Sequence, residues 1–151
     1  MPSVSKSVLL PHSRERMFAL VADVERYPTF LPWCGGASVN IEADGAVLAT
    51  VVIDFRGLRQ SFTTRNRNLA PDTVTMELVK GPFRQLHGQW RFTALKENAC
   101  KVEFRLEYEF AAGLLGKALA PIFDYIAGSM VDAFVRRADA LVVPPSVPGQ
   151  N

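Results

Sequence analysis

The central part of this chain alternates between apolar and polar residues in a series of short segments. The clearest segment carries Val102, Phe104, Leu106, Tyr108 and Phe110, with mostly charged residues between them. Alternation with a period of two is typical of a strand with one buried face and one solvated face. The chain is therefore constrained to form a sheet that needs a cover on one side.

Several other segments show the same strand pattern. We expect strands at residues 4–10, 37–42, 47–55, 58–68, 74–78, 86–92 and 102–110, with turns at Ala43-Asp44-Gly45, Arg56-Gly57, Ala70-Pro71-Asp72 and Asn98. Short connections join neighbouring antiparallel strands, so the pattern predicts a meandering sheet of about six or seven strands.

A long helix is predicted after Gly113, over residues 114–142. Its apolar residues recur at steps of three and four, namely Leu119, Ile122, Phe123, Ile126, Met130, Phe134 and Leu141. Pro121 should either kink this helix or mark its first turn. Only this helix is large enough to cover the apolar face of the sheet. The predicted fold is α+β, a curved antiparallel sheet wrapped around the C-terminal helix, and such a sheet commonly leaves a cavity beneath the helix.

An aromatic run follows a short helix that we expect from Ser13, its N-cap, to about residue 24. We expect Pro28 to end that helix and residues 29–33 to form short further turns. The large apolar side chains of the run must be covered, either by the domain's own core or by an apolar ligand: Tyr27, Phe30, Leu31 and Trp33. The run is therefore either a lid that opens for a ligand or a fixed core segment.

Composition favours one domain, over residues 1–142, followed by a disordered tail at residues 143–151 that is rich in Pro, Ser and Gly. The net charge of +2 provides no strong field toward nucleic acid, and we expect no DNA partner. Cys34 and Cys100 fit no metal or redox spacing and are expected to be buried. We find no signal peptide and no apolar stretch near the ~20 residues of a membrane span, which favours the cytoplasm.

Two motifs carry a resemblance to a known family. They are Asp23-Val24-x-x-Tyr27-Pro28-x-Phe30-Leu31-Pro32-Trp33-Cys34 and Lys80-Gly81-Pro82-Phe83-x-x-Leu86-x-Gly88-x-Trp90-x-Phe92. The chain resembles the START-like, helix-grip superfamily (SRPBCC), in its polyketide cyclase/dehydrase or lipid-transport branch, and within it the coenzyme Q-binding protein and ribosome association toxin (RatA) group. The resemblance implies a helix-grip fold. It also implies one of two roles, ubiquinone binding in support of respiration or binding to the large ribosomal subunit that blocks subunit association.

The inward stripes are candidates for a ligand-binding wall, although they suit a close-packed core equally well. The candidate residues are Tyr27, Phe30, Leu31, Trp33, Val51, Ile53, Phe62, Met76, Leu78, Trp90, Phe92, Phe104, Leu106, Tyr108, Phe123, Ile126, Met130 and Phe134. Lys80 in the second motif could offer a charge at the mouth of such a cavity, or simply belong to a Gly-Pro turn.

Five arginines near one hairpin are candidates for a partner-binding surface: Arg56, Arg59, Arg65, Arg67 and Arg84. They could contact ribosomal RNA phosphates or anionic lipid headgroups, the latter in a transient membrane contact. The alternative is a solvated sheet face. No aromatic residues are interleaved with these arginines, which argues against readout of single-stranded RNA.

Catalytic and metal motifs are not found in the sequence. His12 and His87 match no metal spacing, and no paired carboxylates, phosphate loop or nucleophile elbow occurs. Tyr108 is the one weak candidate for an acid or base inside a pocket. We therefore expect no enzyme, no metal and no cofactor besides a hydrophobic ligand such as ubiquinone. The alternative is a RatA-type toxin that acts on the ribosome.

Overall fold

The computed structural model describes residues 3–141, so the predicted tail and its boundary at residue 142 lie outside the described residues. The elements follow one another as β1 (Ser3–Leu10), α1 (Arg14–Ala22), the 3-10 helix η1 (Val24–Thr29), β2 (Cys34–Ile41), β3 (Val47–Phe55), β4 (Leu58–Leu69), β5 (Thr73–Lys80), β6 (Phe83–Lys96), β7 (Ala99–Phe110) and α2 (Leu114–Leu141).

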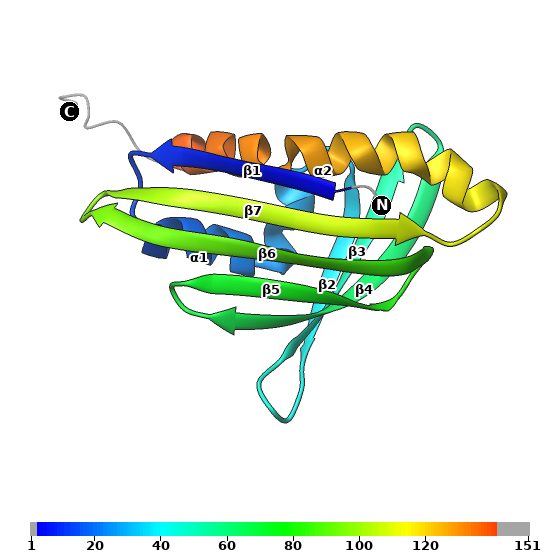
Figure 1. Cartoon of the computed structure of the whole chain (residues 1–151), viewed down its shortest axis with the longest axis horizontal. Helices are drawn as coiled ribbons and strands as arrows, with labels where there is room; N and C mark the ends of the chain where they lie inside the picture. Colours follow the sequence, from blue (N-terminus) through cyan, green and yellow to red (C-terminus); the bar gives the residue numbers. More distant parts are fainter. Residues whose placement is uncertain (1–2, 142–151) are drawn as a thin grey trace.

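The strands form one antiparallel sheet of seven strands in the order β1-β7-β6-β5-β4-β3-β2. Strands β2 to β7 form a meander, and β1 pairs with β7 at the edge far from β2. In Figure 1, β1, β7 and β6 run nearly along α2, whereas β2 and β3 cross that direction steeply. The sheet is therefore strongly twisted and curves around the helix, which confirms the predicted fold class.

Local sequence signals explain several element boundaries. The Ser13 side chain accepts a hydrogen bond from the Arg16 amide at 3.1 Å, as expected of an N-cap. Gly45 and Gly57 have φ angles of 89° and 82° in the turns that join β2 to β3 and β3 to β4. Such angles favour glycine because it has no Cβ.

The predicted helices differ from the observed ones in three places. Helix α1 ends at Ala22, and Pro28 lies inside η1 rather than ending the first helix. A short 3-10 helix has no apolar periodicity long enough to be read from sequence. Pro121 lies inside α2 and does not mark its first turn. Leu141, expected on the buried stripe, is 48% exposed.

Helix α2 is also long and apolar enough, by length and composition alone, to cross a membrane, which corrects the expectation that no segment reaches that limit. A core helix of a soluble protein passes the same test. Here one face of α2 is buried, including Leu119, Phe123, Ile126 and Phe134. Its apolar character is therefore accounted for in part by packing within the domain.

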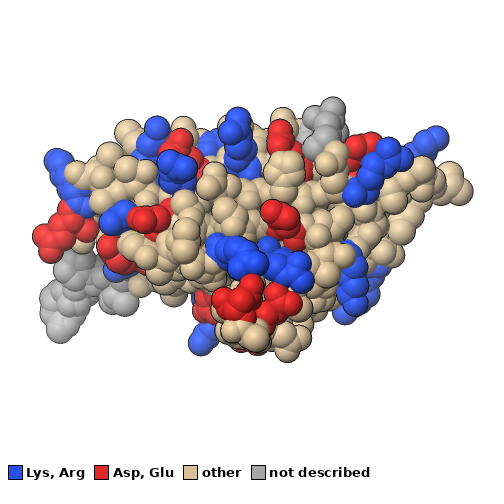
Figure 2. Space-filling view, turned by 60° about the horizontal axis from the view of Figure 1, so that its bottom comes forward, with Lys and Arg blue, Asp and Glu red and all other residues tan. Residues whose placement is uncertain are grey.

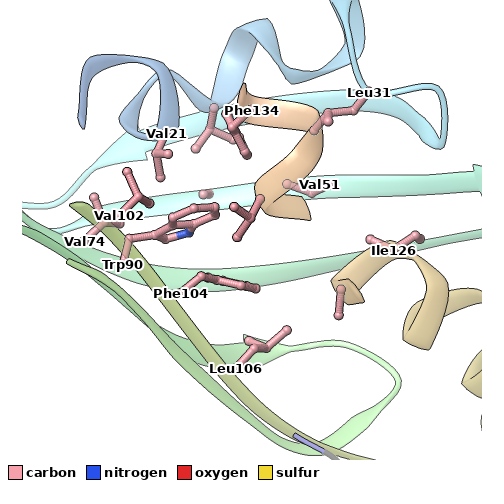
Figure 3. Packing of buried hydrophobic residues seen from close by; sticks show 14 of the residues in the cluster. Val21, Leu31, Val51, Val74, Trp90, Val102, Phe104, Leu106, Ile126 and Phe134 are labelled. Carbon is pink, nitrogen blue, oxygen red and sulfur yellow. The ribbon is translucent and has the colours of Figure 1, made fainter. Parts of the chain in front are cut away.

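The hydrophobic core lies between the concave face of the sheet and α2, with α1 and η1 closing one side. Figure 3 shows Trp90 and Phe104 from the sheet and Phe134 from α2 pointing into the same interior. Trp90 lies 4.3 Å from Phe104 and 5.3 Å from Phe134 between ring centroids. Ring contacts thus join the helix to the sheet directly.

Candidate functional site

A cavity of about 70 Å³ lies inside the core, between the sheet and α2. Almost all of its wall is apolar. It is lined by Val24, Tyr27, Trp33, Ala49, Val51, Phe62, Thr64, Asn66, Met76, Leu86, Trp90, Phe104, Leu106, Phe123, Ile126, Ala127, Met130 and Phe134.

Most of the residues predicted to form a ligand-binding wall do line this cavity. The six that do not are Phe30, Leu31, Ile53, Leu78, Phe92 and Tyr108. Leu31, Ile53, Phe92 and Tyr108 are fully buried in the surrounding core instead. Leu78 faces a groove described below, and Phe30 is half-buried against Phe134. Alternation along a strand predicts which side chains point inward, and the cavity wall is drawn from these side chains. It does not predict where the packed side chains leave a space.

Sequence reasoning missed six residues of the wall: Val24, Ala49, Thr64, Asn66, Leu86 and Ala127. Ala49, Thr64 and Leu86 lie two or four residues from the predicted wall residues Val51, Phe62 and Trp90, and therefore on the same faces of their strands. Asn66 continues the face of Thr64 by two residues, and the same period-two rule could have found it. Asn66 was missed because the candidate wall residues were chosen for their apolar side chains, and asparagine is polar.

The aromatic run covers one end of the cavity. Tyr27 lies 5.4 Å from Phe134 and 6.1 Å from Phe30 between ring centroids, and all three contacts within this trio have edge-to-face geometry. The Tyr27 hydroxyl donates a hydrogen bond to the Val21 carbonyl at 2.5 Å. Burial raises the pKa of Tyr27 well above its ordinary value, with Cys34 and Asp23 adding to the effect. This segment is therefore anchored by its own contacts.

A groove of about 860 Å³ lies on the outer face of the sheet, over β5, β6 and β7. The ladder between β5 and β6 ends at the Glu77–His87 pair, although β5 continues to Lys80. The groove is lined by Thr75, Met76, Glu77, Leu78, Arg84, Gln85, Leu86, His87, Gly88, Gln89, Arg105 and Glu107. Met76 and Leu86 line both the groove and the internal cavity. Their two side chains thus separate the cavity from the outer face where the strands diverge.

The cavity offers little for acid or base chemistry. The wall side chains with polar atoms are Thr64, Asn66, the Tyr27 phenol and the indoles of Trp33 and Trp90. An alcohol, an amide, an indole and a phenol of raised pKa do not exchange protons readily near neutral pH. Tyr108 does not line the cavity, and its hydroxyl donates a hydrogen bond to Asp124 at 2.5 Å. Burial, followed by the Asp124 carboxylate, raises the pKa of Tyr108. The Tyr108 hydroxyl, the candidate acid, is therefore already hydrogen-bonded to Asp124 and does not line the cavity.

Metal and thiol chemistry finds no support within residues 3–141. No group of three or more His, Cys, Asp or Glu side chains there could hold a metal ion. Cys34 and Cys100 are free and buried, and burial raises the pKa of both thiols. His12 pairs with Asp139 at 2.7 Å, and His87 with Glu107 at 2.6 Å. Both histidines thus have acidic partners on neighbouring elements.

The basic set is largely paired with acidic side chains. Four arginines each have such a partner: Arg59 with Asp54 at 2.6 Å, Arg65 with Glu42 at 2.8 Å, Arg67 with Asp44 at 3.2 Å, and Arg84 with Glu109 at 3.6 Å. Arg56 lies over the Phe55 ring at 5.1 Å. Figure 2 shows Lys and Arg next to Asp and Glu over this face rather than in one basic patch. The pairing favours the solvated-face interpretation.

The names of two curated relatives match the two roles that the resemblance implied, one role each. The "Ribosome association toxin RatA" of Vibrio cholerae is 45% identical over 138 residues, which cover 91% of this chain and 96% of the relative. The "Coenzyme Q-binding protein COQ10, mitochondrial" of Drosophila melanogaster is 27% identical over 147 residues, or 95% of this chain and 61% of that protein.

Solved structures support the fold. A START superfamily protein from Mycobacterium smegmatis has a TM-score of 0.77 at 20% identity, covering 93% of this chain and 99% of its own. The Zhui aromatase/cyclase from a Streptomyces species has a TM-score of 0.79 at 15% identity, covering 97% and 99%. Both likenesses concern the fold alone.

The sequence profile of the family "Polyketide cyclase / dehydrase and lipid transport" matches residues 10–135. With this match and a 45% identical relative, the chain belongs to the polyketide cyclase/dehydrase and lipid transport family of START-like proteins.

Proposed function

We propose that this protein binds a hydrophobic small molecule in its internal cavity without transforming it, and that the ligand is a polyprenyl quinone such as ubiquinone. The observation that carries the proposal is the almost wholly apolar wall of a cavity inside the core. Transfer of an apolar chain from water into such a site yields about 25 cal/mol per Å² of buried surface. The name of the Drosophila relative supports the quinone as the ligand.

The cavity must enlarge for such a ligand to bind. Its 70 Å³ is little more than twice the ~30 Å³ that one water occupies in the liquid, which is too small for a substituted quinone ring. The adjoining groove of about 860 Å³ lies just beyond Met76 and Leu86. Met76 is unbranched and adapts its shape readily. In the proposed complex the ring occupies the enlarged cavity, and the tail passes Met76 into the groove.

The test begins with gentle purification, organic extraction and mass spectrometry from cells that contain quinone. Both tryptophans of the chain, Trp33 and Trp90, line the cavity. Quinone binding should therefore quench intrinsic fluorescence in a titration of the purified protein. Ala127→Leu places a larger side chain in the cavity wall and should weaken binding, while Ala118→Leu on the exposed face of α2 should not. Saturable binding that is unaffected by Ala127→Leu would place the ligand elsewhere.

We infer a second candidate function, association with the large ribosomal subunit in the cytoplasm. It is supported by the name of the Vibrio cholerae relative, which is 45% identical over 91% of this chain. The test is co-sedimentation of the purified protein with large subunits in a sucrose gradient. Arg59→Gln with Arg67→Gln removes two exposed charges of the basic set. Unchanged co-sedimentation of that variant would show that Arg59 and Arg67 do not belong to the contact surface.

A further inference from the structure

Strand β4 places two polar side chains in the wall of the otherwise apolar cavity. Thr64 and Asn66 are each 5% exposed and both line the cavity. They face the same side because alternate residues of a strand do so. The Tyr27 hydroxyl of the same wall already donates its hydrogen to the Val21 carbonyl, and the indoles of Trp33 and Trp90 carry one N–H donor each.

The hydrogen bond between the two side chains leaves one end of the Asn66 amide free. The Thr64 hydroxyl donates to Asn66 Oδ1 at 2.7 Å, which uses the single hydrogen of the hydroxyl and orients the amide. Within residues 3–141, the Asn66 Nδ2 group has no hydrogen-bond partner. Asn66 lines the cavity, so an acceptor oxygen on a ligand bound there is available to this donor.

Asn66 also lies at the inner side of the opening between β5 and β6. Its Cα is directly opposite that of Met76 in the ladder between β4 and β5. Met76 is one of the two residues shared by the cavity and the outer groove. A ligand that passes Met76 from the groove therefore reaches Asn66 with its leading end.

We propose that Asn66 Nδ2 is the polar anchor of the ligand site and donates a hydrogen bond to an acceptor oxygen on the ligand's leading end. This inference rests on the proposed function and specifies the ligand further. The cavity wall contains no charged side chain. An anionic or cationic head would lose its hydration without a counter-charge. The site therefore selects a neutral head with a carbonyl oxygen, which a quinone has, over a phosphate or a free carboxylate.

The experiment compares two probes with the same tail, a decyl-substituted ubiquinone analogue and decylbenzene, by calorimetry on the full chain. We expect the wild type to bind the quinone more tightly than decylbenzene by about three- to tenfold, the worth of one neutral hydrogen bond. Asn66→Leu should remove that difference and leave decylbenzene binding intact. Asn68→Leu, at an exposed position of the same strand, is the matched control and should keep the difference.

The two proposals fail in distinguishable ways. Equal affinity of the wild type for both probes, or an Asn66→Leu variant that keeps its preference, overturns the anchor while the cavity stands. Binding of neither probe overturns the proposed function and the anchor with it. Tighter binding of the corresponding hydroquinone than of the quinone would show that the free end of the amide is its oxygen, which also overturns the proposal.

A measurement on the wild type covers the case in which Asn66→Leu does not fold. The side-chain NH₂ signals of Asn66, assigned by NMR in the ¹⁵N-labelled protein, should shift when the quinone is added and stay in place with decylbenzene. Equal shifts with both probes would contradict a hydrogen bond to the ligand.

Discussion

Two tyrosines show how single residues tie the core of this protein to its polar periphery. Tyr27 donates to the Val21 carbonyl and Tyr108 to the Asp124 carboxylate, and both rings lie in the hydrophobic cluster. Each hydroxyl is thus satisfied by a group on a nearby helix. Because burial disfavours the charged phenolate, both pKa values lie above the ordinary value of 10.0.

These shifts predict a loss of stability at alkaline pH. The raised pKa means that the folded state keeps phenol protons that the unfolded chain loses. The contribution of the two phenols to the free energy of unfolding is therefore complete below about pH 10 and declines above it. Urea unfolding between pH 8 and pH 11 should show a less steep decline for the variant Tyr27→Phe with Tyr108→Phe. Tyr125→Phe, at the 60% exposed third tyrosine, should follow the wild type. Parallel profiles for all three proteins would contradict the prediction.

At the scale of elements, α2 has an internal proline that weakens it. Pro121 is exposed and lies inside the helix, where it has no N–H to donate to the residue 117 carbonyl. We predict that Pro121→Ala stabilises the protein by about 1–3 kcal/mol, since proline costs about 3 kcal/mol relative to alanine in a helix interior. Thermal and urea unfolding would measure the change. A decrease in stability would mean that the ring makes packing contacts worth more than the hydrogen bond.

The diverging ends of β5 and β6 give a kinetic prediction. Met76→Ala removes one of the two side chains between the cavity and the groove. If the ligand passes there, its association rate in stopped-flow tryptophan quenching should rise severalfold. Val79→Ala, at a 42% exposed position of the same strand, is the control and should leave the rate unchanged. An unchanged rate for Met76→Ala would assign the route to another part of the surface.

Elements whose bounds are set by neighbouring residues could be predicted from the sequence, whereas elements set by distant contacts could not. The bounds expected for residues 47–55 agree with β3 (Val47–Phe55) because turn residues flank the segment on both sides, at Ala43-Asp44-Gly45 and Arg56-Gly57. The 3-10 helix η1 and the end of the ladder at Glu77 depend on twist and on distant contacts, which leave no period in the sequence. The stripes likewise predicted which strand faces turn inward. The role that we propose for Asn66 depends instead on its surroundings, which come from four other strands and from the helices η1 and α2.

At the scale of the whole molecule, residues 3–141 contain one continuous hydrophobic cluster, and with the half-buried residues packed against it this cluster includes residues from every helix and strand. Its unfolding should therefore be a single cooperative transition. Trp33 and Trp90 report the core by fluorescence, and far-UV circular dichroism reports the backbone; the two urea curves should coincide. Separate midpoints would indicate that α1 and η1, or the edge strands, unfold independently of the rest.

The position of α2 also bears on how the protein is made. The helix that covers the concave face follows all seven strands in the chain, and β1 finds its partner only when β7 has been added. During translation the sheet's apolar face is thus synthesised before α2 can cover it. A nascent chain halted before residue 114 would expose Trp90, Phe104 and Leu106 to solvent. Such an intermediate is a natural client for chaperones, and completion of the last helix is the step that releases it.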